Sequence, residues 1–318
     1  MNAVKGEHLK GAHIFFAIIG VKMSFDEDEE KIAVKNSQGV PFSSTLKPAG
    51  SSAKYDYTPE KPSSKLAFTV FGQKGSAKTF TAFGITSGRR EVISFDHKSV
   101  LIAENYYQGE DIVVYDGLKY FNESEEQVKR TATITMDYVL NLIMQMRNPE
   151  SIIIDGYDRL AFIAQMHMRN IKNLEPYAPV GGGNLGYYWY VRNEILDRVF
   201  DTAYTKTKKS VVYTTYSKKD NIIIDGEIFK SVDVAKWTGN LLTQSDVVIK
   251  TNFERSKNGN EYLATIESAK TNKLISGKVY NLTNFKKLRD FPEWAALSGF
   301  ENKNGVVNDK DRNKTSLV

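Results

Sequence analysis

The octet from Gly72 to Thr79 carries the most specific chemistry in the sequence. It reads Gly-Gln-Lys-Gly-Ser-Ala-Lys-Thr and matches the phosphate-binding pattern G-x-x-x-x-G-K-[ST] except at Ala77, which takes the place of the second glycine. In such a loop the backbone N–H groups point at phosphate oxygens, a lysine adds positive charge and a hydroxyl reaches Mg²⁺. The octet therefore predicts a site for a magnesium-bound nucleoside triphosphate.

Each residue of this octet has a predicted part in holding phosphate. Gly72 and Gly75 permit a tight backbone turn. Lys78 would supply positive charge at the β- and γ-phosphates, and the Thr79 hydroxyl would reach Mg²⁺. A small Cβ is tolerable at Ala77, where a helix begins, whereas a bulky side chain is not. The predicted nucleotide-binding residues, with ATP and Mg²⁺ as cofactors, are Gly72, Gly75, Ser76, Ala77, Lys78 and Thr79.

A second motif, Ser151-Ile-Ile-Ile-Asp155, is an apolar strand that ends in a carboxylate. In a parallel sheet this carboxylate can hold a magnesium-bound water beside the phosphate loop. An isolated aspartate at such a point more commonly caps the following helix. Beside the octet we favour the magnesium role, so Thr79 and Asp155 are the predicted metal residues. Asp158 is expected in the first turn of the next helix rather than as a ligand.

Hydrolysis needs a further carboxylate, because Gly156 rather than a glutamate follows Asp155. Asp96 ends the strand after the helix of the phosphate loop, and it is the candidate base that would activate water. A role for Asp96 as a cap or turn residue is the alternative. From these motifs the predicted catalytic residues are Lys78, Asp96 and Asp155.

The elements that would position these residues alternate along the chain. Short apolar runs are typical of buried strands, and helical stretches lie between several of them. The predicted strands are 66–71, 91–95, 111–115, 151–154, 210–215 and 246–250, and the predicted helices are 78–87, 123–147, 157–172 and 188–206. This alternation predicts an α/β fold with a mostly parallel central sheet flanked by helices. The strand pair 262–266 and 278–282 would add antiparallel strands at the C-terminal edge.

The composition is that of a globular protein and excludes several kinds of site. Of 318 residues, 41% are hydrophobic and 25% are charged, and there is no cysteine. Disulfides, cysteine-bound metals and a thiol nucleophile are therefore excluded. No apolar run reaches the roughly 20 residues of a membrane span, and the run 12–23 is interrupted by Lys22. We expect no membrane partner and a cytoplasmic location, in the host cytoplasm if the chain is viral.

Changes in composition divide the chain into four predicted segments. Residues 1–39 form an N-terminal extension, and 40–64, rich in serine, proline, lysine and glycine, form a linker or surface loop. The ATPase domain is predicted over 65–300. Residues 301–318 are polar and mixed in charge, which predicts a disordered tail.

The order of these elements resembles that of the RecA/Rad51-like P-loop ATPases, in particular the compact proteins of phages and archaeal viruses that accompany single-strand annealing. The resemblance covers about residues 65–283 and rests on element order more than on residue identity. It implies a RecA-like core and a homo-oligomer with ATP at the subunit interface. It also implies that Lys270 and Lys273 are catalytic residues reaching the neighbouring subunit's γ-phosphate. Their spacing is one residue longer than the usual form, and solvated lysines on a turn are the alternative.

Single-stranded DNA is the partner that this resemblance implies. The two DNA-contacting loops of the family correspond to the glycine-rich segment 176–186 and to 217–236, which carries four basic and four acidic residues. The segments 205–219 and 268–289 are basic and contain no acid, so they can contact phosphates. The aromatic run 187–190 could supply stacking platforms, although most of its rings are expected in the core. The strand end 214–216 lacks the polar sensor, glutamine or asparagine, of the family.

Together these features predict a magnesium-dependent protein that binds and hydrolyses ATP and acts on single-stranded DNA in recombination, annealing or replication. A nucleic-acid translocating motor, such as a packaging ATPase or helicase, would share the site but would show DNA-stimulated turnover and directional movement. A scaffold that binds nucleotide without hydrolysing it is the third alternative, left open by Ala77 and by the lack of an acid beside Asp155. Such a scaffold would release no phosphate with or without DNA.

Overall fold

A computed structural model describes the chain at residues 65–179, 185–224, 227–236, 239–257, 259–270 and 273–297. The predicted extension, linker and tail lie outside these residues, as does the centre of the predicted DNA loop 176–186. The predicted domain boundaries therefore stay predictions. Among the helices that the structure describes, none is both long and apolar enough to cross a membrane.

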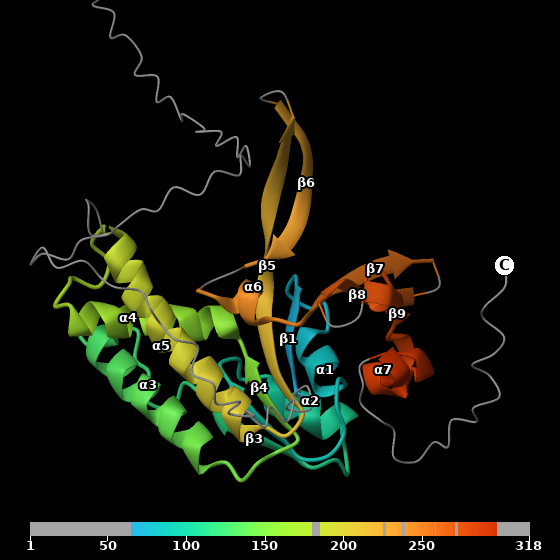
Figure 1. The fold of residues 1–318 in the computed structure, drawn as a ribbon, viewed down its shortest axis with the longest axis horizontal. Coiled ribbons are helices and arrows are strands. Elements are labelled where there is room, and N and C mark those ends of the chain that lie inside the picture. The colour runs from blue at the N-terminus through green and yellow to red at the C-terminus, as the bar shows by residue number, and fades with distance from the viewer. Residues whose placement is uncertain are drawn as a thin grey trace, which may run out of the picture. The chain divides into compact units, whose positions relative to one another are not determined.

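The described strands form a nine-stranded sheet in the order β3-β2-β4-β5-β1-β7-β8-β9, with β6 paired to β5 (Figure 1). They are β1 (Leu66–Gly72), β2 (Arg90–Ser94), β3 (Ile112–Asp116), β4 (Ser151–Asp155), β5 (Ser210–Ile224), β6 (Glu227–Ala235), β7 (Val247–Ser256), β8 (Gly259–Ala269) and β9 (Val279–Asn281). The pairs from β3 across to β7 are parallel, and β7, β8 and β9 pair antiparallel. This confirms the predicted α/β fold, with a mostly parallel central sheet and antiparallel strands at the C-terminal edge.

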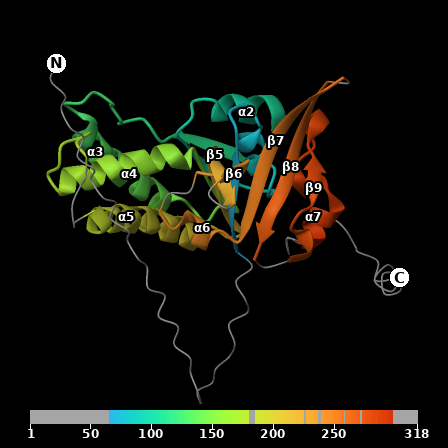
Figure 2. The ribbon, with the colours of Figure 1, turned by 90° about the horizontal axis from the view of Figure 1, so that it is seen from above.

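Helices cover both faces of this sheet. They are α1 (Lys78–Phe83), α2 (Ser99–Tyr106), α3 (Val128–Gln145), α4 (Tyr157–Ile171), α5 (Leu185–Lys206), α6 (Leu241–Gln244) and α7 (Pro292–Leu297). Side chains of a strand point alternately to the two faces. In β4, accordingly, Ile152 and Ile154 belong to the core formed with α3, α4 and α5, whereas Ile153 belongs to the core on the α1 side. Figure 2 shows α3, α4 and α5 grouped together.

Some helix boundaries differ from the predicted ones. Helix α1 ends at Phe83 instead of continuing to Ser87, and α3 begins at Val128 instead of Glu123. The Phe83 carbonyl, which would accept from Ser87 N–H in a longer α1, accepts a hydrogen bond from the distant Arg289 instead, as does the Thr86 carbonyl. The sequence prediction also lacks α2, α6 and α7, which are short helices whose positions depend on the core that they cover.

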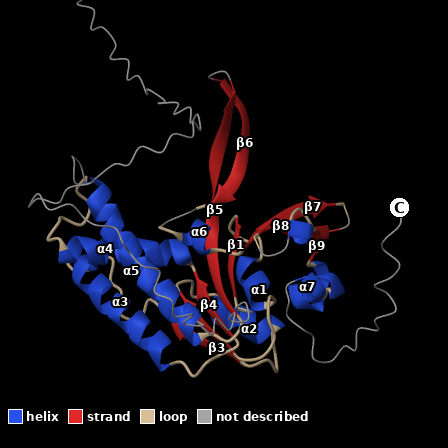
Figure 3. Ribbon diagram, viewed as in Figure 1, coloured by secondary structure: helices blue, strands red, loops and turns tan. Residues whose placement is uncertain are grey.

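The segment 217–236 is a two-stranded ribbon, so its prediction as a loop is wrong. β5 continues past Tyr216 and β6 returns antiparallel to it, with Ser217 opposite Ala235. Up to Tyr216 the strand β5 pairs with β1 inside the sheet, and beyond that residue it pairs with β6. Figure 3 shows this ribbon extending away from the helices. The pairing satisfies the backbone N–H and C=O groups of a strand that leaves the sheet.

Parallel strands bring the motif-bearing strand ends to one edge of the sheet. Because β1, β2, β4 and β5 run in the same direction, their carboxyl ends are neighbours. Asp155 at the end of β4 lies beside Ser94 of β2 on one side and Thr214 of β5 on the other. Gly72 at the end of β1 lies beside Tyr216. Open α/β sheets bind ligands at this edge.

Candidate functional site

A pocket of about 580 Å³ lies where the octet follows β1. The predicted residues that line it are Gly75, Ala77, Lys78, Thr79, Asp96 and Asp155. The Ser76 hydroxyl instead donates to the Gln73 carbonyl at 2.8 Å and is 2.7 Å from Thr251 Oγ1. A Cβ on Gly72 would approach Ser76 Oγ and Thr251 to 2.4 Å. Gly72 and Ser76 therefore shape the loop from behind.

Asp155 is the centre of a hydrogen-bond network among the strand ends. Its side chain is buried, and three hydroxyl groups donate to its carboxylate: Thr79 at 3.0 Å, Ser99 at 2.5 Å and Thr214 at 2.5 Å. Burial raises the pKa of Asp155, and the three hydrogen bonds oppose that rise. Carboxylate and hydroxyl oxygens are ligands that Mg²⁺ prefers, so Thr79 and Asp155 fit the predicted metal role.

The amino group of Lys78 is held inside the pocket by two contacts. It donates to the Gln73 carbonyl at 2.8 Å, and it lies 4.2 Å from the centre of the Tyr216 ring, which is a cation–π contact. Burial lowers the pKa of Lys78, and nearby carboxylates, Asp155 foremost, oppose that fall. Lys78 must leave the ring and the carbonyl in order to reach a phosphate group.

Ala77 has a left-handed backbone conformation, which glycine adopts more readily than alanine. Its φ of 65° and ψ of 28° lie in the left-handed region, directly before α1 begins at Lys78. An L-residue with a Cβ is disfavoured there by about 1–2 kcal/mol relative to its right-handed form. From the sequence we expect a small Cβ to be tolerated at Ala77 because a helix begins there. The sequence does not reveal that the backbone of this residue is strained. The Ala77 carbonyl accepts hydrogen bonds from both the N–H and the Oγ1 of Thr81, which tie this residue to the first turn of α1.

Replacing Ala77 by glycine is expected to stabilise the protein. Glycine removes the left-handed strain but gains backbone freedom in the unfolded chain, so the net increase in the free energy of unfolding is about 0.5–1 kcal/mol. Urea denaturation of Ala77→Gly measures this change. The matched control is Ala82→Gly inside α1, which should lose about 1 kcal/mol because ordinary helical backbone favours alanine. A destabilised Ala77→Gly protein would contradict the account of strain.

Two further carboxylates line the pocket. Asp96 is half-buried in the loop after β2, and its Oδ1 accepts a hydrogen bond from the Lys98 backbone at 3.3 Å. Asp158 lies in the first turn of α4, as predicted, and its buried Oδ1 has no hydrogen-bond partner among the described residues. Burial raises the pKa of Asp158, and the charge of Lys236 opposes that rise. The sequence prediction assigns Asp158 no role, whereas the structure places it in the site.

Lys270 lies away from the pocket of its own subunit. It follows β8, whose last residue Ala269 is opposite Val247, and Val247 is beside Phe68 near the amino end of β1. The octet follows the other end of that strand. The Lys270 amino group donates to the Thr243 carbonyl at 2.6 Å. Lys273 begins the 3-10 helix Lys273–Ile275, and its side chain is outside the described atoms. A catalytic role of both lysines in trans stays a prediction.

The predicted DNA-contacting groups divide into buried and exposed ones. In the run 187–190, Tyr187 and Tyr190 are exposed, whereas Tyr188 packs against the core. In the basic segment 268–289, Lys287 and Arg289 both form ion pairs with Glu110, so part of its charge is neutralised within the protein. The segment 205–219 ends within β5, where the ribbon begins.

Two contacts of the predicted site residues were not predicted from the sequence. Ser99 follows Asp96 in the first turn of α2 and reaches Asp155, and Tyr216 holds Lys78. A serine shortly after a strand is too common to identify by spacing. Tyr216 could have been predicted to lie in the site, because the strand end 214–216, where the family has its polar sensor, lies beside the octet.

No protein-family model matches the sequence, and no curated protein matches it. Among solved structures, the chain is similar to the KaiC-like protein PH0186 of Pyrococcus horikoshii OT3. The two share 12% sequence identity with a TM-score of 0.37, over 68% of this chain and 84% of that one. The fold assignment rests on the strand order and register described above.

Proposed function

We propose that the chain binds ATP together with Mg²⁺ in this pocket and hydrolyses it. The observation that carries the proposal is the contact between Thr79 and Asp155, the two residues predicted to serve the metal, at 3.0 Å. They belong to separate motifs, and the parallel register of β1, β5 and β4 brings them together. If Asp155 only capped α4, its carboxylate would not need to contact the Thr79 hydroxyl.

The chain's own residues have distinct parts in this reaction. The backbone N–H groups of the octet and the Lys78 amino group bind the phosphates, Lys78 exchanging its contacts with Gln73 and Tyr216 for phosphate oxygens. Thr79 and Asp155 would hold Mg²⁺, which supplies positive charge at the phosphate oxygens. Asp96 remains the proposed acceptor of the proton from the attacking water, since it lines the same pocket.

Action on single-stranded DNA is part of the proposal, in annealing, recombination or replication. Its support is the exposure of Tyr177, Tyr187 and Tyr190 around the glycine-rich segment 180–184. The amino group of Lys172 lies 4.7 Å from the centre of the Tyr187 ring and donates to its hydroxyl, which places a cation beside an exposed ring. Aromatic rings and cations together bind single strands by stacking and phosphate contacts. A homo-oligomer with Lys270 and Lys273 acting in trans completes the proposal.

Loss of the Lys78 charge is expected to weaken the binding of MgATP at least tenfold, because the amino group contacts the phosphates directly. Calorimetric titration of Lys78→Ala with MgATP measures this loss. The matched control is Lys74→Ala. Lys74 is an exposed lysine of the same loop and lines the same pocket. Equal affinities of wild type and Lys78→Ala would sink the proposed site.

Phosphate release with and without single-stranded DNA separates the alternatives. The proposed ATPase releases phosphate, and DNA changes its rate. Release that depends strongly on DNA, together with directional movement along it, would favour a translocating motor. Binding of MgATP without any release, in both conditions, would favour a non-hydrolysing scaffold and would overturn the proposed hydrolysis.

A further inference from the structure

Two buried serines lie behind the pocket, between the proposed base and the metal carboxylate. Ser94 ends β2 and Ser99 begins α2, and each exposes at most 6% of its surface. Neither is among the residues that line the pocket, so they would act on a bound nucleotide only through other residues. Ser94 is beside Asp155 in the register of β2 and β4. Buried hydroxyl groups need hydrogen-bond partners, and these partners decide what each serine holds in place.

The hydrogen bonds of the two serines connect Asp96 to Asp155. Ser99 Oγ donates to Asp155 Oδ2 at 2.5 Å, and it lies 2.6 Å from Ser94 Oγ. Ser94 Oγ accepts from the Asp96 backbone N–H at 3.2 Å and donates to the Asp96 carbonyl, so it holds the backbone of Asp96 on both sides. The path from the proposed base to the metal carboxylate therefore runs through two hydroxyl groups.

The direction of these hydrogen bonds follows from counting protons. A hydroxyl group has one proton, and it can accept further bonds through its lone pairs. The Ser99 proton goes to Asp155, because a carboxylate that serves Mg²⁺ is ionised and such acceptors form the stronger bonds. Ser94 must then be the donor in its contact with Ser99, and it shares this proton with the Asp96 carbonyl. The chain runs from the Asp96 N–H to the Asp155 carboxylate, and removing either hydroxyl breaks it.

Other contacts of the same loop orient Asp96 in a different way. Its Oδ1 accepts from the Lys98 N–H at 3.3 Å, which fixes the side chain relative to its own backbone. The Ser99 N–H donates to the Asp96 carbonyl at 3.3 Å, and the Phe95 N–H donates to the Asp155 carbonyl at 2.8 Å. These bonds shape the loop and join it to β4, whereas the serine chain fixes the backbone of Asp96 relative to the side chain of Asp155.

We propose that Ser94 and Ser99 are positioning residues, which set the place of the Asp96 base relative to the metal carboxylate of Asp155. The inference rests on the proposed function, in which Asp96 accepts the proton of the attacking water and Asp155 serves the metal. A base must lie within hydrogen-bond reach of that water. A displacement of about 1 Å lowers a rate by as much as about a hundredfold. Loss of either hydroxyl therefore slows hydrolysis and leaves the binding of the phosphates to the octet unchanged.

The first test compares Ser99→Ala and Ser94→Ala with wild type. Each variant is expected to lower kcat for MgATP hydrolysis about ten- to a hundredfold and to keep the Kd for MgATP within about twofold of the wild-type value. The two substitutions break the same chain, so the double variant should be about as slow as the slower single variant. Losses of kcat that multiply in the double variant would contradict a shared chain.

A double-mutant cycle with Asp96→Asn shows whether the serines act through the base. In the Asp96→Asn background the residual kcat should be the same with and without Ser99→Ala, because no base is left to be positioned. A serine that supported only the fold or the metal would lower kcat by the same factor in both backgrounds. That result would overturn the proposal.

The matched control is Ser151→Ala, at the opposite end of β4. Ser151 is also buried in a chain of hydroxyl groups, and its Oγ lies 2.5 Å from Thr86 Oγ1 and 2.7 Å from Ser210 Oγ. It begins the strand that Asp155 ends, so its loss removes a buried hydroxyl away from the site. Ser151→Ala should keep the wild-type kcat. A loss of kcat equal to that of Ser99→Ala would show a general need for buried hydroxyls and would overturn the specific role.

The outcomes separate this role from the function on which it rests. Wild type that releases no phosphate overturns the proposed hydrolysis, and the positioning role with it. Asp96→Asn with the wild-type kcat overturns the proposed base, and again the positioning role with it. A slow Asp96→Asn, together with the wild-type kcat in both Ser94→Ala and Ser99→Ala, overturns the positioning role alone.

Discussion

Asp155→Asn is expected to reduce magnesium-dependent ATP hydrolysis by about 100- to 1000-fold, because it removes a negative charge where the metal's charge is to be held. The amide oxygen can still accept from Thr79 and Thr214, and the amide NH2 in place of Oδ2 can donate to the Ser99 hydroxyl, which then accepts instead of donating, so the network of strand ends should remain. Phosphate release as a function of magnesium concentration measures the change. If the substitution only weakens the binding of Mg²⁺, the variant should regain part of its rate of ATP hydrolysis at a high magnesium concentration.

The matched control for this variant is Asp116→Asn. Asp116 also ends a parallel strand at this edge, beside Ser94, but it is exposed and does not line the pocket. It should hydrolyse ATP like wild type. Thermal unfolding of Asp155→Asn without ligands should show no loss of stability, because the asparagine avoids the cost of burying a carboxylate. Wild-type hydrolysis by Asp155→Asn would contradict the metal role of Asp155.

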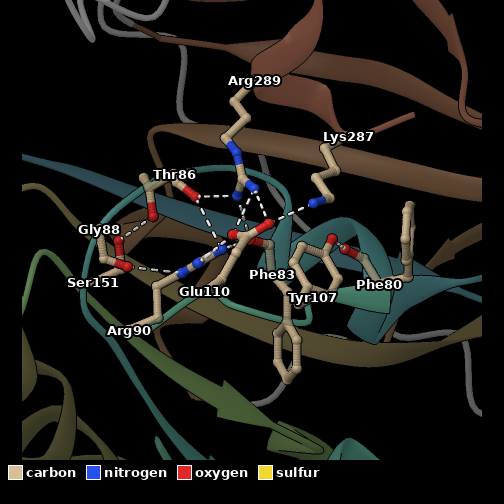
Figure 4. Close-up of polar contacts among 10 residues, drawn as sticks. All are labelled: Phe80, Phe83, Thr86, Gly88, Arg90, Tyr107, Glu110, Ser151, Lys287 and Arg289. Carbon is tan, nitrogen blue, oxygen red and sulfur yellow. Dashed lines mark hydrogen bonds and ion pairs between the residues drawn. The ribbon is translucent and has the colours of Figure 1, made fainter. Parts of the chain in front are cut away.

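Glu110→Gln is expected to lower the free energy of unfolding by about 2–3 kcal/mol, since it leaves three cations around a neutral side chain. The Glu110 carboxylate accepts from Arg90 at 2.5 Å, from Arg289 at 2.6 Å and from Lys287 (Figure 4). Arg90 is buried, and both arginines also donate to the Phe83 carbonyl at the end of α1. The cluster therefore joins the C-terminal segment to the helix that carries the P-loop.

The pH dependence of stability provides a second measure of this cluster. Burial alone would raise the pKa of Glu110, but hydrogen bonds from Lys287 and Arg90 and the charge of Arg289 bring it down to about 2. A carboxylate whose pKa is lower in the folded state stabilises the fold above its unfolded pKa of about 4.3. That contribution should be lost as the pH falls from about 4.3 towards 2, and Glu110→Gln should lack this part of the loss.

Urea denaturation at neutral and acidic pH tests both statements. The matched control is Glu150→Gln, because the Glu150 side chain is about as exposed as that of Glu110, 24% against 21%, but its partners Lys208 and Lys209 are far more exposed than those of Glu110. Exposed ion pairs contribute little, so this control should lose less than about 1 kcal/mol. Equal losses in the two variants would show that the Glu110 cluster is no more than a surface ion pair.

Local sequence was enough to predict most of the strands and helices and the tight turn of the octet between β1 and α1. Buried parallel strands are continuous apolar runs, and a phosphate loop has strict spacing, so both leave a local signal in β1 and the octet. The carboxyl ends of parallel strands must share an edge, and for that reason the pairing of Thr79 with Asp155 also followed from two motifs read together. The ribbon 217–236 could not be predicted from the sequence, because a strand that leaves the sheet has the same polar composition as a loop.

Tertiary structure alone decided what surrounds the octet. The octet's place between a strand and a helix was predictable from its spacing, but the left-handed backbone of Ala77 depends on the whole loop and could not be inferred from one substituted glycine. Residues 106 and 285 meet although β2 and β9 lie far apart in the sheet, because both rings pack against Phe80 of α1, and contacts over such a separation have no sequence spacing. The sequence by itself therefore determined where phosphate is expected to bind, whereas the fold decided which rings, cations and carboxylates lie around it.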